Sequence, residues 1–280
     1  KEGKEIGYEG FELGNKFPKD GPGLKAKLDE FGLACVSGWY SGFLAEVPAG
    51  LSDEQAVAAE IERCQAHMSK LQYNDVQVVV YGECAGTIQG QIDTPVGKRP
   101  QFASDALWQA YAERLNAFGQ HLLETYGIKL AYHHHMGAYV ESPADVDRLM
   151  QLTDPAKVFL LFDTGHAYFG GALTPAELLQ KHVKRVVHVH CKDVRPQVIA
   201  QARNESWSFL NGVINAIAQM FAGKARAVGS NSMLIEGYAN RENKKFRVLW
   251  TSEPYHDLAL MVSGRVPEKD LKAVANAFLG

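Results

Sequence analysis

Residues Val186–Arg195, Val-Val-His-Val-His-Cys-Lys-Asp-Val-Arg, form the stretch that decides the fold class. The first half alternates with a period of two, which predicts a β-strand with Val187 and Val189 on one face and His188 and His190 on the other. The strand then runs directly into Lys192 and further charged residues. A strand that ends in titratable groups is typical of the active-site rim of an α/β enzyme. The same pattern would arise from two buried histidines whose hydrogen bonds are made within the core, followed by charged residues that face solvent.

Short strands and helices alternate from Tyr8 to about Val194. The expected strands are Gly10–Leu13, Ala34–Ser37, Val76–Tyr81, Leu130–His133, Val158–Asp163 and Val186–His190. The expected helices lie near Leu24–Phe31, Asp53–Leu71, Asp105–Tyr126, Pro143–Leu152 and Thr174–His182, with Ser52, Ser104 and Thr174 as N-caps. This alternation predicts a parallel α/β sheet, open or closed into a barrel. Neither a GxGxxG nor a Walker A motif supports nucleotide binding.

Composition narrows the function classes. The chain has 280 residues, enough for one α/β barrel or two medium domains. The formal net charge of −3 offers no attraction to a phosphate backbone or an anionic membrane, and no apolar run could span a bilayer, so we expect neither nucleic acid nor membrane as a partner. Four scattered cysteines without a CxxC pair fit a reducing cytoplasm, where we expect the protein to work.

Carboxylates and imidazoles recur where the expected strands end. These residues are Glu12, Glu83, His133, His135, Asp163, His166, His188 and His190. Parallel strands bring their carboxyl ends to one edge of a sheet, whereas independent surface placement would scatter such residues along helices and loops. The sequence therefore predicts one convergent polar site.

A mixture of one aspartate and several histidines suits a borderline divalent cation such as Mn²⁺, Co²⁺ or Zn²⁺, and counts against Ca²⁺ and Mg²⁺. Asp163 and His190 are the first candidate ligands. His133 is the next, with Glu141 as a competitor if the following loop folds back. A histidine that binds a metal usually has its other nitrogen held by a carboxylate or carbonyl, a role open to Glu12 or Glu83.

The remaining polar residues are candidates for chemistry and substrate binding. Candidates for proton transfer are His135, His166, Lys192 and Glu83. Candidates for contact with the substrate are Glu12, Trp39, His188 and Arg195. Trp39 could stack on a sugar ring, but an aromatic residue after a strand is as often part of the core. Arg195 could instead pair with Asp193 in a loop.

Several segments resemble inosose (2-keto-myo-inositol) dehydratases, which belong to the xylose-isomerase-like TIM barrels together with sugar epimerases and endonuclease IV. The resemblance covers roughly residues 5–212. Its densest segments are Gly10–Lys16, Val36–Tyr40, Tyr81–Gln89, Ala131–Gly137, Phe162–His166, His188–Arg195 and Trp207–Leu210.

The resemblance implies a Mn²⁺ or Co²⁺ site and the dehydration of a keto-inositol to a trihydroxycyclohexane-dione in inositol catabolism, with a polyol or keto-sugar as substrate. By similarity to related epimerases, Asp163 and His190 fall on metal positions. His133 falls where those relatives carry a metal-binding glutamate, a departure from the pattern. Glutathione is also attributed to the family, but no residues in the sequence explain it.

The resemblance predicts a TIM-like barrel over residues 1–215 that is incomplete or modified at its first and last strands. Residues 216–280 are of divergent origin, and 228–280 resemble the end of phosphonate-type periplasmic binding proteins. Arg247–Thr251 could supply a last strand and Glu253 a last ligand. An open edge favours cover by this tail or by a partner, and a homo-oligomer is compatible with the sequence. Alternative functions are a metal-dependent sugar isomerase or epimerase, an inactive fusion with a solute-binding fragment, and an endonuclease.

Overall fold

The computed structural model describes residues 2–5, 7–14, 17–89, 91, 93–171, 174–192 and 194–208, together with 227–230, 236, 239–240, 243–251 and 259–263. Contacts divide the chain into two units, which are treated separately below. The first holds residues 1–90 and 94–206, and the second holds 91–93 and 207–280. The domain boundary predicted at residue 215 lies outside the described residues.

The described part of the first unit contains one parallel sheet whose six strands pair in chain order. The strands are β1 (Gly10–Leu13), β2 (Ala34–Gly42), β3 (Val78–Glu83), β4 (Lys129–His133), β5 (Val158–Asp163) and β6 (Val186–His190). The helices are α1 (Glu2–Glu5), α2 (Gly21–Asp29), α3 (Asp53–Tyr73), α4 (Asp105–Tyr126), α5 (Pro143–Leu152), α6 (Thr164–Phe169), α7 (Pro175–His182) and α8 (Pro196–Asn204), with 3₁₀ turns η1 (Val96–Lys98) and η2 (Val183–Arg185). Each neighbouring strand is the next in sequence, so the predicted incomplete TIM-like barrel is confirmed as a six-stranded half-barrel.

Local signals explain where the long helices begin and end. The Ser52 hydroxyl accepts a hydrogen bond from the Gln55 amide, and the Gln55 side chain accepts one from the Ser52 amide, which completes a capping box at the start of α3. The Ser104 side chain likewise accepts a hydrogen bond from the Leu107 amide at the start of α4. Gly127, with φ of 70°, ends that helix in the left-handed region. Thr174 was also expected to cap a helix, but its side chain makes no such bond.

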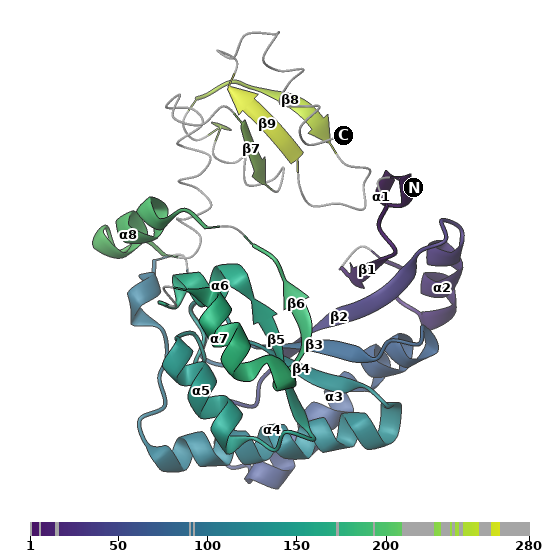
Figure 1. Ribbon diagram of the computed structural model, residues 1–280, viewed down its shortest axis with the longest axis vertical. Coiled ribbons are helices and arrows are strands. Elements are labelled where there is room, and N and C mark those ends of the chain that lie inside the picture. Colours follow the sequence, from purple (N-terminus) through teal and green to yellow (C-terminus); the bar gives the residue numbers. More distant parts are fainter. Residues whose placement is uncertain are drawn as a thin grey trace. The chain divides into compact units, whose positions relative to one another are not determined.

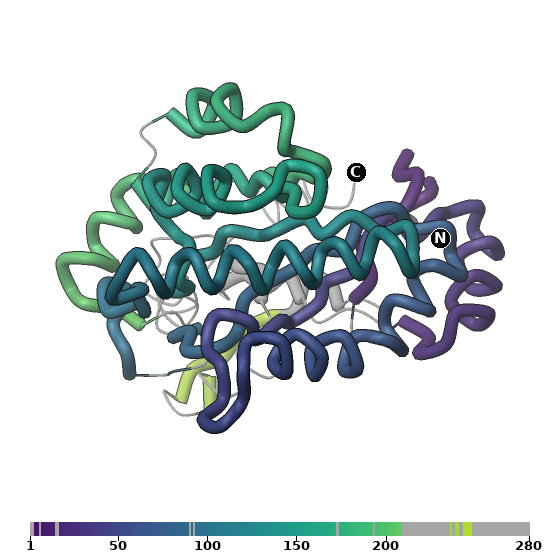
Figure 2. Tube along the Cα trace, turned by 90° about the horizontal axis from the view of Figure 1, so that it is seen from below, coloured from purple at the N-terminus to yellow at the C-terminus, as the bar shows by residue number. Residues whose placement is uncertain are grey.

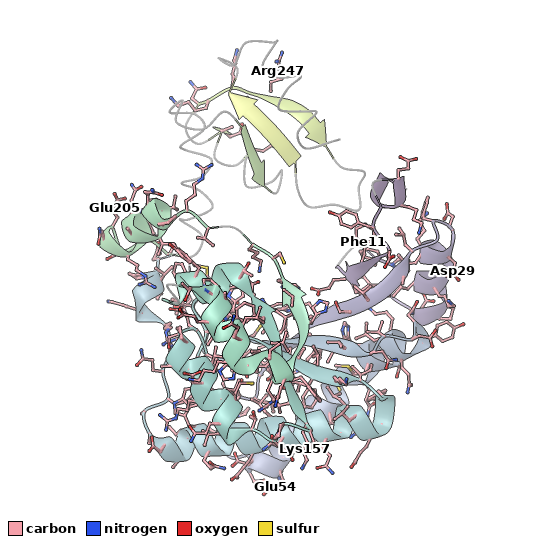
Figure 3. The ribbon with its side chains drawn as sticks, viewed as in Figure 1. Phe11, Asp29, Glu54, Lys157, Glu205 and Arg247 are labelled. Carbon is pink, nitrogen blue, oxygen red and sulfur yellow. The ribbon has the colours of Figure 1, made fainter. Side chains whose placement is uncertain are left out.

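The helices cover one face of the sheet, which we call the helix face. Figure 1 shows α3, α4, α5 and α7 on the same side of the curved sheet, and Figure 2 shows them side by side in chain order. Charged side chains of the outer layer, such as Asp29 and Glu54, extend away from it (Figure 3). Large fully buried side chains fill the space between the layers, including Tyr81, Phe118 and Tyr132. Burying each such side chain contributes about 1.5–3 kcal/mol.

The opposite face, which we call the inner face, has a small apolar floor of Val80, Ala131 and Leu161, with Trp39 packed against it. The sheet is so strongly curved that β6 approaches β3 and β4, with which it does not pair. Side chains of its two outermost strands even meet: Glu12 of β1 is hydrogen-bonded to His190 of β6. The inner face is therefore a concave surface on which residues distant in sequence converge.

The second unit contains an antiparallel sheet in its described part, with the strand order β7-β9-β8. These strands are β7 (Ala227–Ser230), β8 (Phe246–Thr251) and β9 (Ala259–Ser263). The segment Arg247–Thr251 is thus a strand, but it pairs antiparallel to β9. Glu253, the proposed last ligand, lies outside the described residues. Among the helices that the structure describes, none has the length and apolar character needed to cross a membrane.

Candidate metal centre

Strands β4, β5 and β6 bring three of the predicted ligands together on the inner face. Pairing of β5 with β6 places Asp163 opposite His190. The Asp163 Oδ2 atom lies 3.5 Å from His190 Nδ1 and 3.2 Å from His133 Nε2. The alternation along each strand explains this arrangement, because Tyr132 and Phe162 turn to the helix face while the next residue, His133 or Asp163, turns inward.

Asp163 is fully buried, and its carboxylate contacts four groups of the described residues. Its Oδ1 atom accepts a hydrogen bond from the His166 amide at 2.9 Å. Its Oδ2 atom contacts His133, His190 and the ammonium group of Lys192. Burial alone would raise the pKa of this carboxyl group, but the hydrogen bonds from the two histidines outweigh burial and hold its pKa well below the usual range. Asp163 is therefore an ionised carboxylate in a closed environment.

His190 lies between two carboxylates. Its Nδ1 atom faces Asp163, and its Nε2 atom lies 3.1 Å from Glu12 Oε2. Hydrogen bonds to Asp163 and then to Glu12 raise the pKa of His190 to about 9. Although burial opposes the shift, bonds from His188, His190 and Ser37 hold the pKa of Glu12 well below its usual range. Glu12 thus contacts the ring nitrogen of the candidate ligand His190 that faces away from Asp163.

His188 and Ser37 complete the surroundings of Glu12. His188 Nε2 lies 3.2 Å from Glu12 Oε2 and 3.3 Å from the Ser37 hydroxyl, which itself donates to Glu12 at 2.7 Å. The role of Ser37 was missed from the sequence. Its signal was its position two residues before Trp39, on the same face of the strand.

Aromatic contacts frame the centre. The Trp39 ring lies edge-on to His133, with centroids 5.2 Å apart, and its Nε1 atom donates to Ser41 at 3.0 Å. The structure therefore places Trp39 beside the candidate ligands as well as against the apolar floor. Burial lowers the pKa of His133, whose Nδ1 atom is buried without a hydrogen-bond partner among the described residues.

His135 and His166 form a close pair, with ring centroids 3.7 Å apart. The Met136 amide donates to His166 Nδ1 at 3.1 Å, which places the proton of a neutral His166 ring on Nε2. Burial, followed by the charges of neighbouring histidines, lowers the pKa of His166 and lowers that of His135 to about 3. Both rings are accordingly uncharged at neutral pH.

Lys192 is fixed to the turn after β5 through its backbone. Its amide donates to the Thr164 hydroxyl at 2.8 Å, and that hydroxyl donates to the Lys192 carbonyl at 2.7 Å. The Lys192 side chain is 48% exposed to solvent, although its ammonium group contacts the buried Asp163. The contribution of Thr164 was also missed from the sequence, where its position directly after Asp163 was the available signal.

The donor set fits a divalent cation. Two separate groups of three residues each have ligand atoms within 4.8 Å of one another: His133 with Asp163 and His166, and Glu12 with His188 and His190. The contact between Asp163 and His190 joins the groups. Imidazole nitrogens with an ionised buried carboxylate are donors that suit Mn²⁺, Co²⁺ or Zn²⁺. Asp163 Oδ2 contacts one histidine of each group, His133 and His190, and Glu12 contacts the other ring nitrogen of His190.

Glu83 is not brought to this centre. Val79, Tyr81 and Glu83 share one side of β3, and that side is the helix face. The Glu83 carboxylate accepts hydrogen bonds from Tyr81 at 2.9 Å, from Tyr111 at 3.0 Å, and from the amides of residues 45 and 85. The structure thus separates Glu83 from the histidines and contradicts its expected place among the proton-transfer groups.

Two further candidates lie elsewhere. Glu141 accepts a hydrogen bond from the Gly137 amide at 2.7 Å, so its loop does fold back, but its other oxygen lies 3.5 Å from Arg99 and it belongs to neither ligand group. Arg195 is exposed at the start of α8, where its carbonyl accepts from the first turn. Its alternative partner, Asp193, lies outside the described residues.

Comparisons with known proteins agree with the fold and the donor set. The family model for the xylose isomerase-like TIM barrel matches residues 1–237. A protein named inosose dehydratase from Clostridium botulinum (strain Alaska E43 / Type E3) is 39% identical over 207 residues, which make up 74% of this chain and 66% of that protein. The rhizopine catabolism protein MocC of Rhizobium meliloti is 40% identical over 214 residues, covering 76% of this chain and 62% of that protein. The chain thus spans just under two thirds of the length of these relatives.

A solved structure supports the architecture alone. The probable 3-DHS dehydratase AsbF from Bacillus anthracis superposes with a TM-score of 0.50 at 15% identity, over 69% of this chain and 66% of that chain. The expected resemblance of residues 228–280 to phosphonate-type binding proteins has no support in these comparisons, because the barrel family match itself continues to residue 237.

Proposed function

The chain belongs to the xylose isomerase-like TIM barrel family, and from this premise we propose that it catalyses the metal-dependent dehydration of a keto-inositol to a trihydroxycyclohexane-dione. The observation that carries the proposal is the joint convergence of Asp163, His190 and His133 on the inner face. Relatives named inosose dehydratase, with about 39% identity, supply the substrate class. A hydro-lyase acting on a neutral polyol also agrees with the net charge of −3, which offers no general attraction to a phosphate backbone.

The proposed ligands are Asp163, His190 and His133. A divalent cation held there supplies Lewis acidity, which makes a proton beside a ketone easier to remove. Glu12 and Ser37 orient His190, and Trp39 offers an aromatic wall for the ring of a polyol. We expect Mn²⁺ or Co²⁺, with Zn²⁺ as a further candidate, because the donors mix imidazole and carboxylate.

Dehydration needs one group to accept the proton beside the ketone and another to protonate the departing hydroxyl. His135 and His166 are neutral imidazoles in a closed environment. His135 Nδ1 faces the Met136 carbonyl, so its Nε2 atom carries the lone pair and can accept a proton, whereas His166 Nδ1 already accepts the Met136 amide and its Nε2–H can donate one. Lys192 carries an ammonium group at the edge of the same site and can donate one. The products are the dione and one water, so the reaction needs no oxidant and no further co-substrate.

The cellular setting follows from the sequence and stays a prediction. Four free thiols, Cys35, Cys64, Cys84 and Cys191, support a reducing cytoplasm. Residues that would bind glutathione are not recognisable around the described centre, so glutathione stays an expectation from the resemblance alone. A homo-oligomer likewise remains an expectation.

The test is turnover of a keto-inositol by the purified chain. Metal is first removed with a chelator, and Mn²⁺ or Co²⁺ is then added with 2-keto-myo-inositol. Dione formation is followed by chromatography and mass spectrometry. We expect product only with added metal, and none from an Asp163→Asn variant. The matched control, Lys181→Met, removes an ammonium group that pairs with the exposed side of Asp147, and it should keep full activity. Metal-dependent epimerisation of a ketose without loss of water would replace the proposal with an isomerase.

A further inference from the structure

Lys192 differs from the other members of the Asp163 cluster because, as an ammonium ion, it cannot be a metal ligand. Its ammonium group has three donors and no lone pair. The other two side chains on Asp163 Oδ2, His133 and His190, can each give up a proton and turn a lone pair toward a cation. A cation that takes Oδ2 as a ligand carries a charge of the same sign as Lys192, so the two repel each other and compete for that atom.

In the structure, Lys192 already supplies the charge that a cation would supply. Asp163 has no exposed surface, and an ionised carboxylate without a compensating charge is costly in such a place. Lys192 reaches this carboxylate with its tip while nearly half of its side chain faces solvent. The ammonium group is thus placed to leave without disturbing the core.

The backbone of Lys192 is held in place independently of its side chain. Two hydrogen bonds tie it to Thr164, directly after Asp163. A Cβ atom at Gly165 would lie 2.7 Å from Lys192 Cβ, so the close approach of the two segments requires glycine there. After displacement, the ammonium group would remain tethered next to the centre.

We propose that Lys192 is an internal substitute for the metal ion: it neutralises Asp163 in the metal-free protein and is displaced when a divalent cation binds. This rests on the proposed function, in which Asp163 is a metal ligand. The consequence is that Lys192 weakens metal binding while protecting the empty centre, and becomes available to the substrate only once the centre is loaded. Metal loading and the release of a proton donor are thereby coupled.

The first measurement is metal affinity. Isothermal titration calorimetry of the full-length, metal-free chain with Mn²⁺ and with Co²⁺ compares the original protein with Lys192→Met. Losing a charge-assisted competitor should tighten binding about 10- to 100-fold. Lys192→Arg keeps the charge and should bind metal about as the original chain does. Lys181→Met is the matched control, because its ammonium group pairs with Asp147 on the surface and should leave affinity unchanged.

The second measurement needs no variant and so does not depend on folding of the substituted chain. Acetic anhydride modifies exposed amines, and peptide mass spectrometry reports the modified fraction at each lysine. We expect modification of Lys192 to rise severalfold when Mn²⁺ is added and modification of Lys181 to stay constant.

Two results would overturn the inference: unchanged or weaker metal binding by Lys192→Met, or metal binding that leaves modification of Lys192 unaltered. Failure of the two variants and the original chain alike to bind any metal would overturn it as well. If Lys192 is displaced by metal but keto-inositol is not converted, the inference stands and the proposed reaction is wrong.

Discussion

Asp163 and Glu83 end two strands of the same sheet, and both are almost completely buried, at 0% and 2% exposure. Their pKa values nevertheless move in opposite directions. Histidines and an ammonium group around Asp163 hold its pKa far down, whereas burial among tyrosines raises the pKa of Glu83 to about 7 despite the hydrogen bonds it accepts. The difference teaches that, at equal burial, the neighbouring groups decide whether the pKa of a carboxyl group rises or falls. Asp163 is surrounded by imidazoles and an ammonium group on the inner face, whereas Glu83 is surrounded by tyrosine hydroxyls and backbone amides on the helix face.

The largest expected effect is at Asp163. Among the described residues, Asp163 is the one carboxylate that contacts both His133 and His190. We expect Asp163→Asn to lower metal affinity by more than about 100-fold, since even residues that merely orient ligands cost about 10- to 100-fold. Calorimetry with Mn²⁺ measures the loss, and circular dichroism checks the fold. Retained affinity in a folded variant would remove Asp163 from the centre.

The next effect concerns Glu83 and pH. Its pKa is raised from 4.5 to about 7 in the folded chain, so the folded state binds more protons than the unfolded state between these values. Its contribution to stability is full below pH 4.5 and is lost as pH rises through about 7, which amounts to about 3 kcal/mol. Urea unfolding at several pH values, compared with Glu83→Gln, isolates this slope. An unchanged slope in the variant would contradict the contrast between the two faces.

A smaller effect is expected at Glu12. Glu12→Gln keeps the shape of the side chain but removes the charge that orients His190 through Nε2. We expect metal affinity to fall about 10- to 100-fold, as for other carboxylates behind a ligand histidine. Ser37→Ala, which removes only one bond to Glu12, should cost less. Equal losses in the two variants would mean that the charge of Glu12 is unimportant.

The smallest effect tests whether the faces are independent. Tyr111→Phe deletes a hydroxyl that bonds to Glu83 and to Tyr132, each at 3.0 Å. We expect a loss of about 1 kcal/mol in unfolding free energy, the usual size for one buried hydrogen bond, with unchanged metal affinity. Denaturation and calorimetry on the same sample give both values. A change in metal affinity would show that the helix face influences the centre.

Much of the fold could be predicted because its signals are local. Three strand ranges, Gly10–Leu13, Val158–Asp163 and Val186–His190, were predicted with the bounds that the structure has. The caps at Ser52 and Ser104 depend on contacts three residues away and were also predicted correctly. The expected strand Val76–Tyr81 instead covers Val78–Glu83, since β-propensity does not mark where pairing with β2 and β4 begins.

The site was only partly predictable. Alternation of residues along a strand shows which side chains share a face of the sheet, but it does not show whether that face is the helix face or the inner face. Alternation along β3 places Glu83 on the same face as Val79 and Tyr81, and the contacts of Glu83 with Tyr81 and Tyr111 agree with this. Only the packing of α4 shows that this face points away from the histidines, through the bond from Tyr111. Likewise, nothing near Glu141 in the sequence indicates Arg99 as its partner. Long-range partners of this kind depend on the whole fold.

The chain-order pairing of the six strands has a consequence for biosynthesis. Each strand leaving the ribosome can add to the edge left by its predecessor, so the half-barrel can grow from its amino-terminal side without waiting for distant segments. The polar centre cannot grow in this way, because Glu12 belongs to the first strand and His190 to the sixth. Its side chains assemble only after synthesis has passed His190, 178 residues beyond Glu12, so the sheet can form in steps whereas the polar centre is completed only when the sixth strand has paired.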